Sequence, residues 1–80
     1  MGGYYFHTKI GQEILRDEEG DELPSQDQAR AKAIRAAREL VADAIKAGHN
    51  LEVDAILIED ESGDATPIRI EDAVPQWSRR

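Results

Sequence analysis

The side chains with the clearest chemical potential surround His7. A tight turn at residues 11–12 would fold the N-terminal segment into a hairpin that places His7 opposite Arg16. Alternate residues of a strand share one face, so Tyr5 would lie beside this pair. Such a cluster could bind a carboxylate or a phosphate through charge-assisted hydrogen bonds. The simpler interpretation, which we favour, is a histidine hydrogen-bonded within the sheet or to Glu18.

Two acidic segments, residues 17–22 and 60–64, raise the question of a calcium site. Carboxylate oxygens are the ligands that calcium prefers, and the EF-hand loop needs an Asp at its first position and a Gly at its sixth. Counting back from Gly20 and from Gly63 reaches a leucine and an isoleucine, so neither segment fits that loop. We therefore expect solvated turns and no bound metal.

Catalytic groups find little support elsewhere in the chain. There is no cysteine, and none of the serines lies in the Gly-x-Ser-x-Gly elbow of a hydrolase. Glu18 and Glu19 lie in a predicted exposed turn, where nothing prepares them for acid catalysis. Glycine-rich phosphate loops and dinucleotide-binding fingerprints are also missing from the sequence. We expect no enzymatic activity and no cofactor.

Periodicity predicts the elements that must position the His7 cluster. Four segments rich in β-branched, aromatic or alternating apolar residues are typical of strands, namely residues 4–10, 13–17, 51–58 and 66–70. One helix is expected between Ser25, which forms a capping box with Gln28, and Gly48, which can end a helix in the left-handed conformation. The order β-β-α-β-β predicts an α+β fold, with the helix packed on one face of a four-stranded, mainly antiparallel sheet.

The apolar stripe of the predicted helix is made largely of alanine. Its members are Ala29, Ala33, Ile34, Ala36, Ala37, Leu40, Val41, Ala44 and Ile45. Small side chains allow a helix to lie close to a sheet. Residues 56–58 are apolar on both faces, as in an interior strand, whereas Pro67 lacks an N–H and places the last strand at an edge.

The two faces of the predicted sheet differ in polarity, because successive side chains of a strand point to opposite sides. The more apolar face, which is expected to contact the helix, carries Tyr4, Phe6, Thr8, Ile10 and Leu15. The other face carries Tyr5, His7, Lys9, Ile14 and Arg16. Four strands and one helix leave this second face uncovered, and open faces of this kind commonly pack against another copy or a partner.

Length and charge narrow the classes of partner. The 80 residues are expected to form one domain over residues 1–74, followed by a tail at residues 75–80 in which Trp77 docks back on the domain. Ten basic and seventeen acidic residues give a net charge of −7, which repels phosphate backbones, so we expect no nucleic-acid binding. No apolar run approaches the length of a membrane span and no signal peptide is recognisable, which favours a cytoplasmic protein without membrane attachment.

Several runs of residues carry a resemblance to a known family. They are Tyr5-Phe6-His7, Arg16-Asp17-Glu18-Glu19-Gly20 with Glu22-Leu23, the alanine- and arginine-rich helix, the run from Ile56 to Gly63, and Ile68-x-Ile70-x-Asp72-Ala73. On these runs the chain resembles a family of small bacterial domains of unknown function. This sequence has Ser25 where such domains often show Asp, and either residue caps a helix. The resemblance implies no activity, ligand or catalytic residue.

The layout of a hairpin, a capped helix and a further strand in a short acidic chain is also similar to HicB-type antitoxins, which would imply a toxin partner. Three functions therefore remain open. The first is a non-enzymatic module that self-associates or binds a protein through the open sheet face or an edge strand. The second is an antitoxin-like inhibitor of a basic partner protein. The third is a binder of small anions that uses His7 and Arg16, with Tyr5 and Ile14 as neighbouring contacts.

Overall fold

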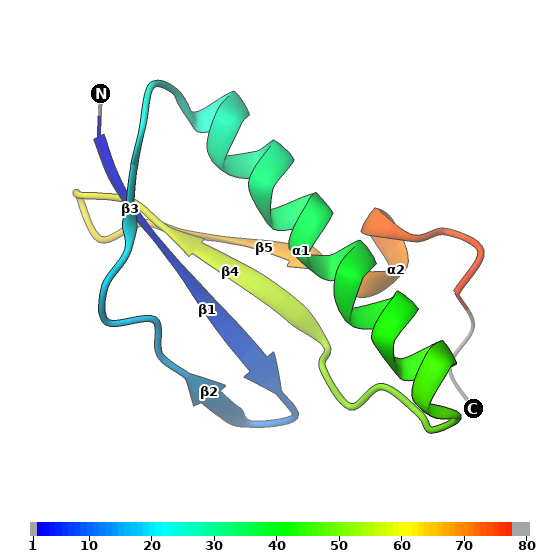
Figure 1. The fold of residues 1–80 in the computed structure, drawn as a ribbon. Helices are drawn as coiled ribbons and strands as arrows, with labels where there is room; N and C mark the ends of the chain where they lie inside the picture. Colours follow the sequence, from blue (N-terminus) through cyan, green and yellow to red (C-terminus); the bar gives the residue numbers. More distant parts are fainter. Residues whose placement is uncertain (1, 78–80) are drawn as a thin grey trace.

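One long helix lies across one face of an antiparallel sheet in the computed structural model, which describes residues 2–77 (Figure 1). The elements follow in the order β1 (Gly2–Ile10), β2 (Glu13–Leu15), β3 (Asp21–Leu23), α1 (Gln26–Ala47), β4 (Ala55–Glu59), β5 (Ala65–Arg69) and α2 (Ile70–Ala73). The predicted α+β fold, with one long helix packed on a mainly antiparallel sheet, is confirmed. The short elements β3 and α2 were not predicted.

The strand order explains the composition of each strand. The sheet runs β2-β1-β4-β5, with every neighbouring pair antiparallel, and β3 pairs with the N-terminal half of β1. The apolar strand β4 is interior and the proline-containing strand β5 is an edge, both as predicted. The predicted hairpin register is confirmed for Thr8 with Leu15 and for Ile10 with Glu13. The predicted pairing of His7 with Arg16 is not part of the ladder, because β2 ends at Leu15.

Each of the four predicted strands differs from the structure in at least one bound. Strand β1 begins at Gly2 and not at residue 4, because its first residues pair with β3. Strand β2 ends at Leu15 and not at residue 17, because the Asp17 side chain bonds to the β1 backbone in place of a further strand residue. Strand β4 begins at Ala55 and not at residue 51, since the Asp54 N–H donates to the Lys9 carbonyl out of the ladder register. Strand β5 spans 65–69 and ends where the chain turns into α2.

Helix α1 begins and ends as the sequence predicts. The Ser25 hydroxyl accepts a hydrogen bond from the Gln28 N–H at 3.2 Å, which is the expected N-cap. Gly48 adopts the left-handed conformation with φ of 74° and donates its N–H to the Ala44 carbonyl. The residues of α1 that are buried against the sheet are Ala29, Ala33, Ala37, Val41 and Ala44.

Two residues assigned to the buried layer are exposed. Ile45 is 64 % exposed because it lies about 100° round the helix from Ala44, outside the alanine stripe. Leu15 is 59 % exposed because α1 lies over β4 and β5, whereas β2 is at the opposite edge of the sheet. Both predictions were wrong because the sequence does not show how far across the sheet the helix reaches.

The core lies between α1 and the strands β4 and β5. Its apolar side chains come from β4 and β5, mainly Ile56, Ile58 and Ile68, and from α2, which adds Ile70. Trp77 packs against this cluster, as expected for a tail that docks back. The rest of that tail, residues 78–80, lies outside the described residues.

The alanine stripe yields a first prediction. Ala37 has no exposed surface, so Ala37→Leu would push α1 away from the sheet and should lower the free energy of unfolding by about 2 kcal/mol or more. Ala42 is exposed on the same helix, and Ala42→Leu should change stability by less than about 0.5 kcal/mol. Urea unfolding of both variants tests this, and equal effects would contradict the close packing of the helix on the sheet.

Candidate functional site

A carboxylate fills a gap in the edge of β1. Strand β3 pairs with the first half of β1 and β2 with the second half, which leaves residues 5–7 between them. The Phe6 N–H in this gap donates to Asp17 Oδ2 at 3.1 Å. Asp17 Oδ1 accepts from the N–H groups of Glu19 and Gly20, at 3.2 Å each. Asp17 therefore satisfies a strand-edge donor and closes its own turn with one side chain.

These hydrogen bonds favour the ionised form of Asp17. The pKa of Asp17 is lowered from 3.8, above all by the hydrogen bond from the Phe6 N–H, and partial burial opposes this shift. The bonds from the Gly20 and Glu19 N–H groups lower the pKa further. A negative charge is thus held in the gap of the sheet at neutral pH.

The backbone of Asp17 also fixes the state of His7. The Asp17 N–H donates to His7 Nδ1 at 3.0 Å, so Nδ1 carries no proton. The other ring nitrogen, Nε2, lies 2.7 Å from Glu59 Oε1 and donates to it. The imidazole is neutral, only 3 % exposed, and stacked on the Tyr5 ring with centroids 6.2 Å apart. His7 is hydrogen-bonded within the sheet, as in the simpler interpretation, with Asp17 and Glu59 in place of Glu18.

Gly20 is the one turn residue that comes close enough to β1 to restrict its type. It has φ of +70°, and a Cβ there would lie 2.9 Å from both the Tyr4 carbonyl oxygen and Tyr5 Cε1. A side chain at residue 20 would strain the local backbone and would also collide with the Tyr4 carbonyl and the Tyr5 ring. The turn can therefore close over Tyr5 only with glycine at this position.

Three of the four residues proposed from the sequence meet around Glu59. His7 Nε2 is 2.7 Å and Arg16 Nη2 is 3.5 Å from Glu59 Oε1, and the Tyr5 ring stacks on His7. The fourth residue, Ile14, shares the sheet face but lies opposite Lys9, farther along the hairpin. Glu59 was missed, because only the pairing of β1 with β4 brings it opposite Tyr5.

A shallow hollow of about 310 Å³ opens beside this cluster and is lined by Tyr5, Arg16, Asp17, Glu18 and Glu59. Its polar lining is acidic apart from Arg16, whose guanidinium is paired with Glu59. Because the Asp17 carboxylate already accepts three N–H groups, Glu18 offers the most accessible negative charge of the hollow.

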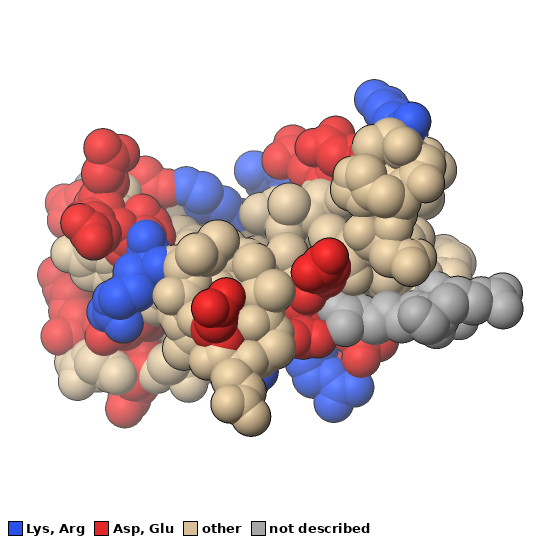
Figure 2. All heavy atoms as spheres, turned by 90° about the horizontal axis from the view of Figure 1, so that it is seen from below, with Lys and Arg blue, Asp and Glu red and all other residues tan. Residues whose placement is uncertain are grey.

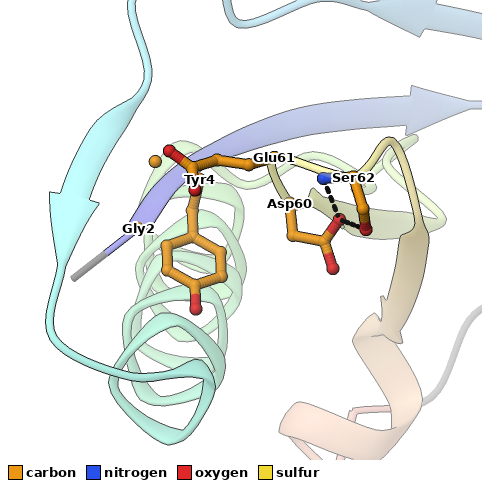
Figure 3. Close-up of a pocket in the computed structure, with 6 residues that line it drawn as sticks. Gly2, Tyr4, Asp60, Glu61 and Ser62 are labelled. Carbon is orange, nitrogen blue, oxygen red and sulfur yellow. Dashed lines mark hydrogen bonds between the residues drawn. The ribbon is translucent and has the colours of Figure 1, made fainter.

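A second hollow, of about 260 Å³, lies at the start of β1 and is lined by Gly2, Gly3, Tyr4 and residues 60–62 (Figure 3). The Ser62 N–H and hydroxyl both donate to Asp60 Oδ1, at 3.0 and 2.7 Å. These bonds hold the β4–β5 turn, and the Ser62 hydroxyl is the main cause of the lowered pKa of Asp60. The Tyr4 ring packs against the core, so this hollow offers little beyond the Glu61 carboxylate.

The two acidic segments lie at the same end of the molecule. The first segment runs into β3, which pairs with residues 2–4 of β1. Glu61, from the second segment, lies beside Gly2 and Gly3 of the same part of β1. Figure 2 shows acidic side chains gathered at the left of the view, the end at which both segments lie in Figure 1. Within residues 2–77, no group of three or more His, Cys, Asp or Glu side chains is arranged to hold a metal ion.

The fold and the net charge define a small acidic α+β domain. The chain belongs to the family DUF6894, described as a domain of unknown function, whose model matches residues 3–66. This confirms the resemblance to an uncharacterised family of small domains. No curated protein and no solved structure gives a significant match. Among residues 2–77, neither helix is both long enough and apolar enough to cross a membrane.

The close approach of Gly20 to β1 yields a second prediction. Gly20→Ala should lower the free energy of unfolding by about 2–3 kcal/mol, because it adds a steric collision to a left-handed backbone. Gly11 has a similar φ of +61° but open space around it, so Gly11→Ala should cost only about 1 kcal/mol. Thermal or urea unfolding measures both, and a Gly20 effect no larger than that of Gly11 would contradict the contact.

The lowered pKa of Asp17 yields a third prediction. A pKa lowered in the folded state stabilises the fold above the unfolded value of 3.8, and this stabilisation is lost as the pH falls through the folded pKa. Asp17→Asn should therefore destabilise the protein by about 1–3 kcal/mol at pH 7. The difference from wild type should shrink in acid. Urea unfolding across pH tests this, and a constant difference would show that charge plays no part.

Proposed function

We propose that this domain is a non-enzymatic module that binds another protein through the sheet face opposite α1. We call this the reverse face, which carries Tyr5, His7, Lys9, Ile14, Ala55, Leu57, Glu59, Ala65, Pro67 and Arg69. Both helices lie on the other side of the sheet (Figure 1), so no helix of residues 2–77 covers this face, and the turn at residues 16–20 lies over part of it. The observation that carries the proposal is that Tyr5 and Ile14 remain 37 % and 45 % exposed there.

The edges of the sheet are poorer docking routes than its face. The Asp60 N–H bonds to the Asp64 carbonyl and the Ile70 N–H bonds to the Asp54 carbonyl. In an antiparallel pair, only alternate residues bond to the neighbouring strand, and these two bonds show that the even-numbered residues of β5 face β4. The backbone groups of the odd-numbered residues, including Pro67, therefore point away from β4. Because Pro67 has no N–H, the middle of this edge lacks a donor for an added strand. At the other edge, Asp17 already occupies the gap in β1.

The binding of small anions is less well supported than protein binding. The Glu59 carboxylate already accepts from His7 and lies 3.5 Å from Arg16, which is the position that an added carboxylate or phosphate would need. A competing anion would have to displace Glu59 and would meet Asp17 and Glu18 nearby. The anion-binding hypothesis stays a prediction without a specific observation in its favour.

Two matched exposed isoleucines test protein binding. We expect Ile14→Ser, on the reverse face, to abolish or strongly weaken capture of a defined partner from the native host, whereas Ile45→Ser, on α1, should not. Both residues are exposed, so both variants should stay folded, which circular dichroism can verify. Partner capture that survives Ile14→Ser but fails with Ile45→Ser would place the interaction on the helix and contradict the proposal.

A further inference from the structure

We propose that the partner of the reverse face is a basic protein segment, in which a Lys or Arg side chain enters the hollow beside Tyr5 and adjacent apolar residues cover Ile14. This inference rests on the proposed function and adds the chemistry of the partner. It excludes a second copy of this chain as the main occupant.

The cations of the reverse face are already used within the molecule. Arg16 pairs with Glu59 and Arg69 pairs with Glu71, each at 3.5 Å. The Lys9 ammonium donates to the Gly11 carbonyl. His7 adds no charge, because its Nδ1 accepts the Asp17 N–H. The charge left to attract a partner is therefore negative.

The hollow has the features that a cationic side chain needs. The Tyr5 ring forms one wall and is 37 % exposed, so a guanidinium or ammonium group can lie against it. Glu18 is exposed at the rim, and within residues 2–77 its carboxylate takes part in no ion pair or hydrogen bond. Glu59 adds a second carboxylate, which an incoming guanidinium could share with Arg16.

Charge also argues against pairing with a second copy. Nine of the seventeen acidic residues fall in residues 16–22 and 59–64, which contain a single basic residue, Arg16. Each copy carries a net charge of −7, so a symmetric face-to-face dimer would bring two acidic surfaces close together, and their repulsion would oppose dimer formation. A basic partner instead gains attraction and faster association from the same charges.

The test uses a defined probe, a short synthetic peptide that alternates arginine with valine, and a control peptide with glutamate in place of arginine. We expect the arginine peptide to bind and to shift NMR signals of Tyr5, Ile14 and Glu59 more than those of α1. Affinity should fall as salt rises from ~0.05 M to ~0.5 M, because the attraction is electrostatic. The glutamate peptide should not bind.

Matched variants separate a docking site from general attraction to an acidic protein. Glu18→Gln and Glu39→Gln each remove one charge from an exposed glutamate, the first at the hollow and the second on α1. Glu18→Gln should weaken binding roughly two- to fivefold, whereas Glu39→Gln should leave it unchanged. Equal effects, or signal changes centred on α1, would overturn the inference.

Two further outcomes distinguish this inference from the proposed function. Sedimentation should show a monomer at micromolar concentration, and a dimer that Ile14→Ser dissociates would overturn the basic partner while leaving the docking face in place. Capture of an acidic host protein that depends on Ile14 but not on Glu18 would likewise overturn the basic partner and leave the docking face in place. Loss of all dependence on Ile14, for peptide and host partner alike, would overturn the proposed function itself.

Discussion

The Asp17 carboxylate in the gap of β1 is the interaction on which the arrangement of the site depends. Two short strands, β2 and β3, share one edge of β1 and leave the Phe6 N–H between them. An unsatisfied backbone donor in the middle of a sheet edge is costly where water does not reach it. One ionised side chain satisfies it and also folds the turn that leads into β3.

The same network sets the electrostatics of the reverse face. The Asp17 N–H holds His7 neutral, and His7 in turn donates to Glu59. Glu59 draws Arg16 into an ion pair, so the one cation beside the hollow is engaged. What remains accessible is an aromatic ring and the carboxylate of Glu18. A chain of hydrogen bonds that begins with the backbone of one turn residue thus decides which sign of charge the face presents.

This network also explains the residues that carry the family resemblance. Phe6, His7, Asp17 and Gly20 belong to the runs Tyr-Phe-His and Arg-Asp-Glu-Glu-Gly, which the predicted hairpin already brings close to each other. In the fold they are joined by hydrogen bonds and by the close approach of Gly20 to Tyr5. The need to hold the turn against β1 accounts for His7, Asp17 and Gly20, whereas Phe6 contributes its backbone N–H and packs its side chain against the core.

The sequence alone determined the long helix and the edge position of β5, because helix caps, apolar periodicity and proline act over only a few neighbouring residues. Ser25, Gly48, the alanine stripe and Pro67 therefore predicted the helix and the edge strand correctly. Only the tertiary structure decided that Leu15 and Ile45 are exposed, since burial depends on how far a helix reaches across a sheet. It also decided the role of Glu59, which meets His7 across 52 residues of chain, a separation over which no sequence period operates.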